Sequence, residues 1–236
     1  MVTPVRVLAW QTEYSDAWPP GLQASKSKLL KKDVFGQVSL TMGDAGPVIT
    51  RDVSSSRWWL RWIARRLKSR EASALLALQD VPNVPRLLES DRDTLRRSWL
   101  AGEPMQHSGP SDPRYFKAAA RLLRSLHRRG VAHNDLAKEP NWLVTPDGDP
   151  AIVDFQLAFR SPARSRLFRI MAREDLRHLL KHKRTYCASH LTQRERRILA
   201  TPAPISRAWM RTGKPLYLFV TRRLFGWSDR EGAGDR

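Results

Sequence analysis

Short runs of alternating apolar and polar residues mark the first patterned part of the chain, residues 29–53. The sequence Gly-Asp-Ala-Gly at 43–46 interrupts them and is typical of a tight turn. A second pair of apolar runs, at 142–144 and 151–153, flanks the turn sequence Pro-Asp-Gly-Asp-Pro at 146–150. These patterns predict two or three β-strands near the start of the chain and a β-hairpin further on.

Apolar residues at helical spacing over residues 57–79 predict a helix. The serines at 54–56 precede it and are suitable N-cap residues, and Pro82 follows its end. The first half of this segment combines tryptophan with arginine. A basic aromatic face of that kind is suited to lipid head groups.

A second helix is predicted to begin at Pro113, because proline suits the first helical position and Asp112 is a preferred N-cap residue. Gly130 is placed to end this helix. Leucines at helical spacing predict another helix at 173–184, and a short one is predicted at 192–200.

The two ends of the chain have less regular patterns. Residues 1–27 hold several prolines and serines and predict an extended arm. Residues 205–227 mix aromatic residues with arginine. This second pattern leaves open whether the segment forms a last core helix or a helix at an interface.

Composition changes this picture mainly through charge. The chain has 236 residues and a formal net charge of +19, which indicates an anionic partner: nucleic acid, a lipid surface or a phosphorylated substrate. A single cysteine, Cys187, excludes a disulfide within the chain and favours a cytoplasmic compartment. The sequence contains no secretory signal pattern and no apolar stretch of the roughly 18 residues that a membrane-spanning helix needs.

Candidate chemistry gathers around the predicted hairpin. Asp135 and Asn141 lie shortly before its first strand, and Asp154 follows its second strand. The hairpin is expected to bring these side chains toward one end of a small sheet. Two carboxylates and an amide oxygen suit Mg²⁺, and a carboxylate can also accept a proton from an attacking hydroxyl. Phosphoryl transfer uses these parts, although aspartate is also common in ordinary turns and caps.

The same stretch resembles the catalytic loop and metal-binding motif of the protein-kinase-like superfamily, H-x-D-L-x-x-x-N followed by D-F-G. The matching sequences are His-Asn-Asp-Leu at 133–136 and Asp-Phe-Gln at 154–156. The resemblance implies that Asp135 is the catalytic base and that Asn141 and Asp154 bind Mg²⁺.

Details of the match depart from the family pattern. His133 is the histidine of the catalytic motif, to which the resemblance gives a structural role. Asn141 follows Asp135 by six residues, one more than usual. Gln156 stands in place of the usual glycine, and Asn134 in place of the usual arginine.

The first strands carry a partial nucleotide-binding pattern. The sequence Phe-Gly-Gln-Val at 35–38 resembles the end of the motif G-x-G-x-x-G-x-V, which implies nucleotide contacts by Gly36 and Val38. Arg51, thirteen residues after Val38, stands where the family pattern V-A-I-K has lysine. Glu71, twenty residues after Arg51, resembles the helix glutamate that pairs with this lysine. The alternative is an ordinary surface glutamate.

Residues 98–103 resemble the hinge between the two kinase lobes, which implies that Trp99 and Ala101 lie beside the adenine. Asp175 has two readings. It either braces the catalytic loop or is a plain surface aspartate.

Together the sequence predicts an α+β, two-lobed, protein-kinase-like fold. Its expected parts are an arm at 1–27, a small β-rich N-lobe with one helix at 28–101, and a helical C-lobe with the catalytic loop at 102–236. Within the superfamily the chain most resembles short, atypical bacterial members, including the lipopolysaccharide-core sugar kinases, and the RIO-type kinases.

The resemblance implies transfer of the γ-phosphoryl group of ATP, with Mg²⁺, to a hydroxyl of a protein Ser/Thr or of a lipopolysaccharide-core sugar. A glycolipid acceptor fits a cytoplasmic protein in peripheral contact with an anionic membrane at its inner face. One alternative is a pseudokinase that binds nucleotide or acts as a scaffold. Nucleic-acid binding is indicated by charge alone, since the sequence has no specific nucleic-acid motif.

Overall fold

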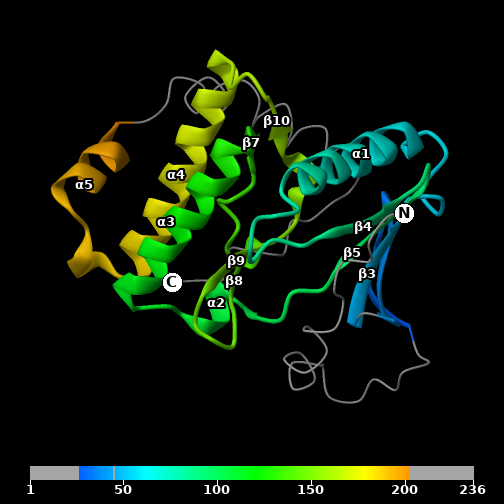
Figure 1. Ribbon diagram of the computed structural model, residues 1–236, viewed down its shortest axis with the longest axis horizontal. Helices are drawn as coiled ribbons and strands as arrows, with labels where there is room; N and C mark the ends of the chain where they lie inside the picture. The colour runs from blue at the N-terminus through cyan, green and yellow to red at the C-terminus, as the bar shows by residue number, and fades with distance from the viewer. Residues whose placement is uncertain (1–26, 45, 202–236) are drawn as a thin grey trace, which may run out of the picture.

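The computed structural model describes residues 27–44 and 46–201, and its first part is a five-stranded antiparallel sheet (Figure 1). The strands are β1 (Lys28–Asp33), β2 (Gly36–Gly43), β3 (Gly46–Asp52), β4 (Leu87–Ser90) and β5 (Thr94–Ser98), in the spatial order β1-β2-β3-β5-β4. Helix α1 (Arg61–Ala77) connects β3 to β4 and lies across one side of the sheet. The strands predicted over 29–53 are confirmed.

A two-residue turn, Val34 and Phe35, joins β1 to β2. The backbone N–H of Phe35 in this turn donates to Asp33 Oδ1 at 2.8 Å. Gly36 follows with φ +129°, and a side-chain carbon there would overlap the carbonyl oxygen of Asp52. The hairpin therefore requires glycine at this position, whatever else the residue contacts.

Helix α1 confirms the predicted helix but not its predicted cap. The helix begins at Arg61, after Leu60, and no side chain caps it. Among the three serines, the Ser54 N–H donates to Asp52 Oδ1 at 2.8 Å, and Ser56 Oγ donates to the carbonyl of Val53 at 2.6 Å. These serines are thus bound within the turn that follows β3, which is why they do not reach the first turn of the helix.

The rest of the described chain is mostly helical. Its elements are β6 (Glu103–Pro104), α2 (Met105–Ser108), α3 (Pro113–Arg128), β7 (Val131–Ala132), β8 (Trp142–Val144), β9 (Pro150–Ile152), β10 (Phe159–Arg160), α4 (Arg166–Tyr186), α5 (Gln193–Ala200) and the short 3₁₀-helices η2 (Glu139–Asn141), η3 (Phe155–Leu157) and η4 (Ala188–His190). Strands β6, β8 and β9 form one small sheet, and β7 pairs with β10. The predicted hairpin is confirmed as the antiparallel pair β8–β9.

Two helices show how well the boundaries were predicted. Helix α3 begins at Pro113 as expected, and the Asp112 carboxylate accepts a hydrogen bond from the Arg114 N–H at 2.7 Å. Helix α4 is longer than the predicted 173–184, because Ser165 caps it through the Phe168 N–H at 3.3 Å. The additional first turns, residues 166–172, contain four large apolar residues, of which Phe168 is buried.

The largest core cluster joins α1 to the helical part of the molecule. It includes Leu75 of α1, Phe116 and Leu123 of α3, Trp142 of β8 and Leu179 of α4. Helix α1 is therefore held from two sides, by the five-stranded sheet and by the helices.

Some predictions fall on other parts of the chain. The predicted arm, apart from residue 27, and the segment 205–227 lie outside the described residues, and the lobe boundary near 101 stays a prediction. No helix of residues 27–44 and 46–201 is long and apolar enough to cross a membrane.

Candidate functional site

The centre of the candidate site is a buried glutamate between two arginines. Glu71 of α1 is completely buried. Its Oε2 lies 3.2 Å from Nε of Arg51 on β3, and its Oε1 lies 3.2 Å from Nε of Arg97 on β5. Both contacts are ion pairs without the N–H alignment of a hydrogen bond. The structure thus joins the predicted Arg51–Glu71 pair and adds a second arginine.

Arg97 was not predicted from the sequence. In the β3–β5 register Ile49 lies opposite Arg97, and Arg51 lies opposite Leu95. Side chains opposite one another, or two residues apart on one strand, share a face of the sheet. The two arginines are therefore diagonal neighbours on the face toward α1, a relation that only the register reveals.

Asp154 belongs to the same charged cluster. It adopts φ +66°, a left-handed conformation in which aspartate is better tolerated than most residues, and Gln156 Nε2 donates to its Oδ1 at 2.7 Å. Burial raises the pKa of this carboxyl, but the charge of Arg51, the hydrogen bond from Gln156 and the charge of Arg97 outweigh it. The net pKa is below its usual value, so Asp154 is ionised at neutral pH.

For Arg97, in contrast, burial is the stronger effect, and the net pKa of the guanidinium is below its usual value. Burial lowers the pKa of its guanidinium, and the negative charge of Glu71 works against that effect. Arginine nevertheless stays charged at neutral pH, because its ordinary pKa is so high. The guanidinium groups of Arg51 and Arg97 and the carboxylates of Glu71 and Asp154 are thus close enough to interact electrostatically. Such a balanced cluster can accept a metal ion and an anion together.

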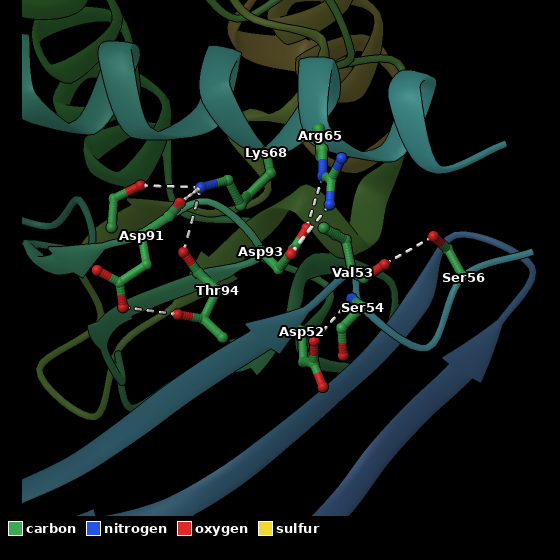
Figure 2. A network of polar contacts seen from close by, with 10 residues as sticks. Asp52, Val53, Ser54, Ser56, Arg65, Lys68, Asp91, Asp93 and Thr94 are labelled. Atoms are coloured by element: carbon green, nitrogen blue, oxygen red, sulfur yellow. Dashed lines mark hydrogen bonds and ion pairs between the residues drawn. The ribbon is translucent and has the colours of Figure 1, made fainter. Parts of the chain in front are cut away.

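Helix α1 is fixed to the sheet by a polar network of residues that precede Glu71 on the helix (Figure 2). Arg65 makes a two-pronged ion pair with Asp93, with contacts of 2.6 and 3.0 Å. One turn later, Lys68 Nζ donates to Ser90 Oγ at 3.2 Å, to the Thr94 carbonyl at 3.2 Å and to the Asp91 carbonyl. These two side chains, which we call the α1 clamp, bind the helix to the β4–β5 turn.

The residues of the predicted catalytic loop form a second group. Asn141 Nδ2 donates to Asp135 Oδ2 at 3.2 Å and to the Asp135 carbonyl at 2.9 Å. Lys138 Nζ, which was not singled out from the sequence, lies 3.0 Å from Asp135 Oδ2. The Val153 N–H donates to the Asn141 carbonyl at 3.0 Å. Asp154 is therefore connected to this group through the backbone of its neighbour.

Asp175 of α4 braces the loop and is not a surface residue. Its side chain is fully buried, and its two oxygens accept hydrogen bonds from the backbone N–H groups of His133 and Asn134, both at 2.8 Å. His127 Nε2 lies 3.2 Å from the same carboxylate. The Asp175 carboxylate thus fixes the backbone just before Asp135 through two hydrogen bonds.

The same face of α4 also contacts the residues that follow Asp135. His182 Nε2 contacts the Leu136 carbonyl at 2.8 Å, and the Tyr186 hydroxyl donates to Glu139 Oε2 at 2.9 Å. These residues lie seven and eleven positions after Asp175, which places all three along one side of the helix. These contacts hold the loop that follows Asp135 against α4.

His133, for which the sequence predicts a structural role, lies in the interior of the molecule. It is fully buried, and its Nε2 contacts the Val153 carbonyl at 2.9 Å. Its ring packs against Phe155 with centroids 4.7 Å apart. The histidine thus connects the catalytic loop to the chain just before Asp154.

The other predicted nucleotide contacts lie on two elements. Val38 pairs directly with Arg51 across β2 and β3. In the predicted hinge, the Trp99 N–H donates to the Pro47 carbonyl at 3.0 Å. Ala101 is buried and lines a surface hollow of about 320 Å³ together with Ser108 and other residues of that region. Roles for Gly36, Val38, Trp99 and Ala101 toward a nucleotide stay predictions.

A metal ion at this site would be bound by oxygen ligands. No cluster of three or more His, Cys, Asp or Glu side chains that could hold a metal ion occurs in the described part of the chain. The available oxygen ligands are the Asp154 carboxylate and the Asn141 amide. Mg²⁺ commonly uses one or two protein carboxylates and completes its shell with phosphate oxygens and water, so this set fits Mg²⁺ bound with a nucleotide.

Comparison with known proteins supports the fold. No protein-family model and no curated protein matches this chain. The crystal structure of the Rio2 kinase from Chaetomium thermophilum is similar, with a TM-score of 0.54 and 16% sequence identity over 76% of this chain and 59% of that chain. This chain therefore spans less than two thirds of that kinase. The likeness shows an α+β, protein-kinase-like fold, as predicted, and the resemblance to bacterial lipopolysaccharide-core sugar kinases stays a prediction.

Proposed function

We propose that the protein is an ATP- and Mg²⁺-dependent phosphotransferase that transfers the γ-phosphoryl group to a hydroxyl. The observation that carries this proposal is the meeting of Arg51, Arg97, Glu71 and Asp154 at one place in a protein-kinase-like fold. If Asp135 and Asp154 only capped turns, there would be no reason to bury Glu71 between two arginines beside Asp154.

Each residue has a distinct part in the proposed reaction. Asp135 orients the acceptor hydroxyl and takes its proton as the new oxygen–phosphorus bond forms and the bond to the β-phosphate oxygen breaks, releasing ADP. Arg51 and Arg97 stabilise negative charge on the phosphates. Asp154 and Asn141 would hold Mg²⁺, which when bound neutralises further phosphate charge. The amide nitrogen of Asn141 is used toward Asp135, which leaves its oxygen for the metal.

The nucleotide would lie between the sheet and the hinge. Gly36 and Val38 would cover it from above, and Trp99 and Ala101 would border the base. The short β1–β2 turn offers fewer backbone N–H groups to the phosphates than a glycine-rich loop does. Arg97 adds positive charge that offsets this difference.

The acceptor belongs to one of two classes, a protein Ser/Thr hydroxyl or a lipopolysaccharide-core sugar hydroxyl. In the second case it would lie on the cytoplasmic side of a membrane.

A pseudokinase is the second candidate function, and one contact favours it. Lys138 lies 3.0 Å from the Asp135 carboxylate, so it competes with the acceptor for the proposed base.

Two substitutions distinguish these candidates. Asp154→Ala is expected to abolish Mg²⁺-dependent ATP binding, since this carboxylate meets the nucleotide in the ground state. Asp135→Asn is expected to leave ATP binding nearly intact and to reduce transfer by about 10²–10⁴-fold, as loss of a general base typically does. Asp147→Asn, in the exposed β8–β9 turn, is the control.

The measurements are ATP affinity by calorimetry with Mg²⁺ and transfer from γ-labelled ATP into separated protein and glycolipid fractions of a lysate. Binding without any transfer above that of Asp135→Asn would favour the pseudokinase. A wild-type protein that does not bind Mg²⁺ and ATP would overturn both readings.

A further inference from the structure

The start of α1 and the tip of the β1–β2 hairpin expose an unusual amount of apolar surface. Trp58 is 82% exposed, Trp62 is 66% exposed and Trp59 is 39% exposed. The Arg57 N–H donates to the Val34 carbonyl at 3.4 Å, which joins this segment to the exposed turn between β1 and β2. We call these five residues, Val34, Arg57, Trp58, Trp59 and Trp62, the tryptophan tip.

Trp58 and Trp62 lie outside the buried side of this segment. The inward side of this segment is provided by Leu60 and Ala64, which are 4% and 2% exposed. Trp58 and Trp62 share the same four-residue spacing but stand on the solvent side. Large exposed apolar side chains gathered on one surface indicate an interaction site.

The charge around the tip identifies the kind of partner. Arg57 is exposed, Arg66 is exposed one turn after Trp62, and Lys32 is exposed on β1. The chain as a whole carries a formal net charge of +19. Basic side chains around protruding tryptophans complement a surface that is anionic outside and apolar beneath. An anionic lipid bilayer has both properties.

Exposed aliphatic side chains on β1 and in the β1–β2 turn favour lipid over nucleic acid. Leu29 is 54% exposed, Leu30 is 43% exposed and Val34 is 36% exposed. These side chains cannot stack on bases, whereas single-stranded nucleic acid is bound mainly by aromatic stacking in a basic groove. Tryptophan, in contrast, is enriched at the boundary between lipid head groups and acyl chains.

We propose that the tryptophan tip docks the protein peripherally on an anionic phospholipid bilayer, with Trp58 and Trp62 inserted at the head-group level. Arg57 and Arg66 bind lipid phosphates beside them. Glu71 lies ten residues beyond the start of α1, about 15 Å along the helix at its usual rise per residue. Docking at this surface therefore does not use the side chains of the buried charged cluster.

The test uses the full chain and sedimentable vesicles of phosphatidylcholine alone or mixed with phosphatidylglycerol. The protein is expected to sediment with the anionic vesicles and to be released by salt, which screens such contacts. The double variant Trp58→Ser/Trp62→Ser is expected to bind at least about tenfold more weakly. Its control is Leu167→Ser, which removes a 42% exposed apolar side chain from α4.

A charge-matched pair isolates the role of the arginines. Arg57→Gln/Arg66→Gln is expected to weaken binding about 30-fold, the effect of two basic residues at an anionic surface. Arg121→Gln/Arg124→Gln removes the same charge from the exposed side of α3 and is expected to bind like wild type. Both arginine variants retain Trp58 and Trp62, so their comparison tests the proposal even if the tryptophan variant misfolds.

Three results would overturn the proposal. Equal losses from both arginine pairs would assign binding to total charge and not to the tryptophan tip. Equal sedimentation with neutral and anionic vesicles would remove the role of lipid charge. Single-stranded RNA that displaces the vesicles and is itself bound less tightly by the tryptophan variant would assign the surface to nucleic acid.

Discussion

Glu71 places one buried carboxylate between the guanidinium groups of Arg51 and Arg97, each 3.2 Å away. Removing the negative charge would leave two buried cations facing each other. The loss of one partner from a buried ion pair is far more costly than the loss of an exposed one, because the remaining charge has no water around it. At the scale of single residues, Glu71 is therefore expected to be essential to stability as well as to the site.

We expect Glu71→Gln to lower the free energy of unfolding by about 3–5 kcal/mol. The matched control is Glu89→Gln, which breaks an ion pair with Arg96 in which both side chains are about half exposed, at 50% and 44%. That change is expected to cost about 1 kcal/mol or less. Urea unfolding followed by circular dichroism measures both. Losses of similar size would show that Glu71 does not hold two buried charges.

The sequence indicated some of these residues and not others, for a physical reason. Arg51 and Glu71 were found by their spacing relative to a known pattern. Arg97 was missed because its proximity to Glu71 depends on how β5 pairs with β3. Lys138 was missed because its contact with Asp135 depends on the path of a loop. Distance along the chain does not report either relation.

At the scale of elements, the position of α1 depends on the α1 clamp, Arg65 with Asp93 and Lys68 with the β4–β5 turn (Figure 2). Burial lowers the pKa of the Lys68 ammonium, and the negative charges of Asp91 and Asp93 oppose that effect. The lysine has three oxygen acceptors in this turn. The clamp thus holds in place the helix that presents Glu71 to both arginines.

We expect Lys68→Met to loosen α1, because the substitution leaves acceptors in the β4–β5 turn without their donor while keeping an apolar stem of similar length. Amide hydrogen exchange should become faster in α1 and in residues 90–94 and stay unchanged in α3. Lys117→Met, at an exposed position of α3, is the control. ATP affinity should fall together with the protection of α1. Unchanged exchange in α1 would remove the clamp from the explanation of how Glu71 is positioned.

Element boundaries show where local patterns were sufficient. The β8–β9 hairpin and the start of α3 were predicted correctly, because a turn sequence and the Asp112–Pro113 cap act on their nearest neighbours. The start of α1 was placed too early, since the Ser54 N–H and the Ser56 hydroxyl bind Asp52 and Val53 in the preceding turn. A cap residue in the sequence predicts a helix start only when no other local partner competes for it.

At the scale of the whole molecule, α4 connects the catalytic loop to the core through buried polar groups. His182 is 6% exposed, and burial lowers the pKa of its ring, while the Leu136 carbonyl and Glu139 act to raise it and Lys181 to lower it. Burial likewise lowers the pKa of His178, with Lys181 acting in the same direction and Asp175 and Glu174 against it. Both histidines are therefore neutral in the folded protein at pH 7.

The stability of the fold should consequently depend on pH in a range where few other groups titrate. A histidine whose folded pKa lies below its unfolded value of about 6.5 takes up its proton more readily in the unfolded chain. Its stabilising contribution is fully present above that value and is lost as pH falls toward the folded pKa. Each histidine can contribute at most about 1.4 kcal/mol per pH unit.

We expect the free energy of unfolding, from urea titrations at constant ionic strength, to fall between about pH 6.5 and 5. The double variant His178→Gln/His182→Gln should flatten this slope, whereas His107→Gln, at an exposed position of α2, should not. A slope that is unchanged in the double variant would mean that acid sensitivity arises elsewhere. A flattened slope would show that the acid sensitivity arises from these two neutral histidines of α4.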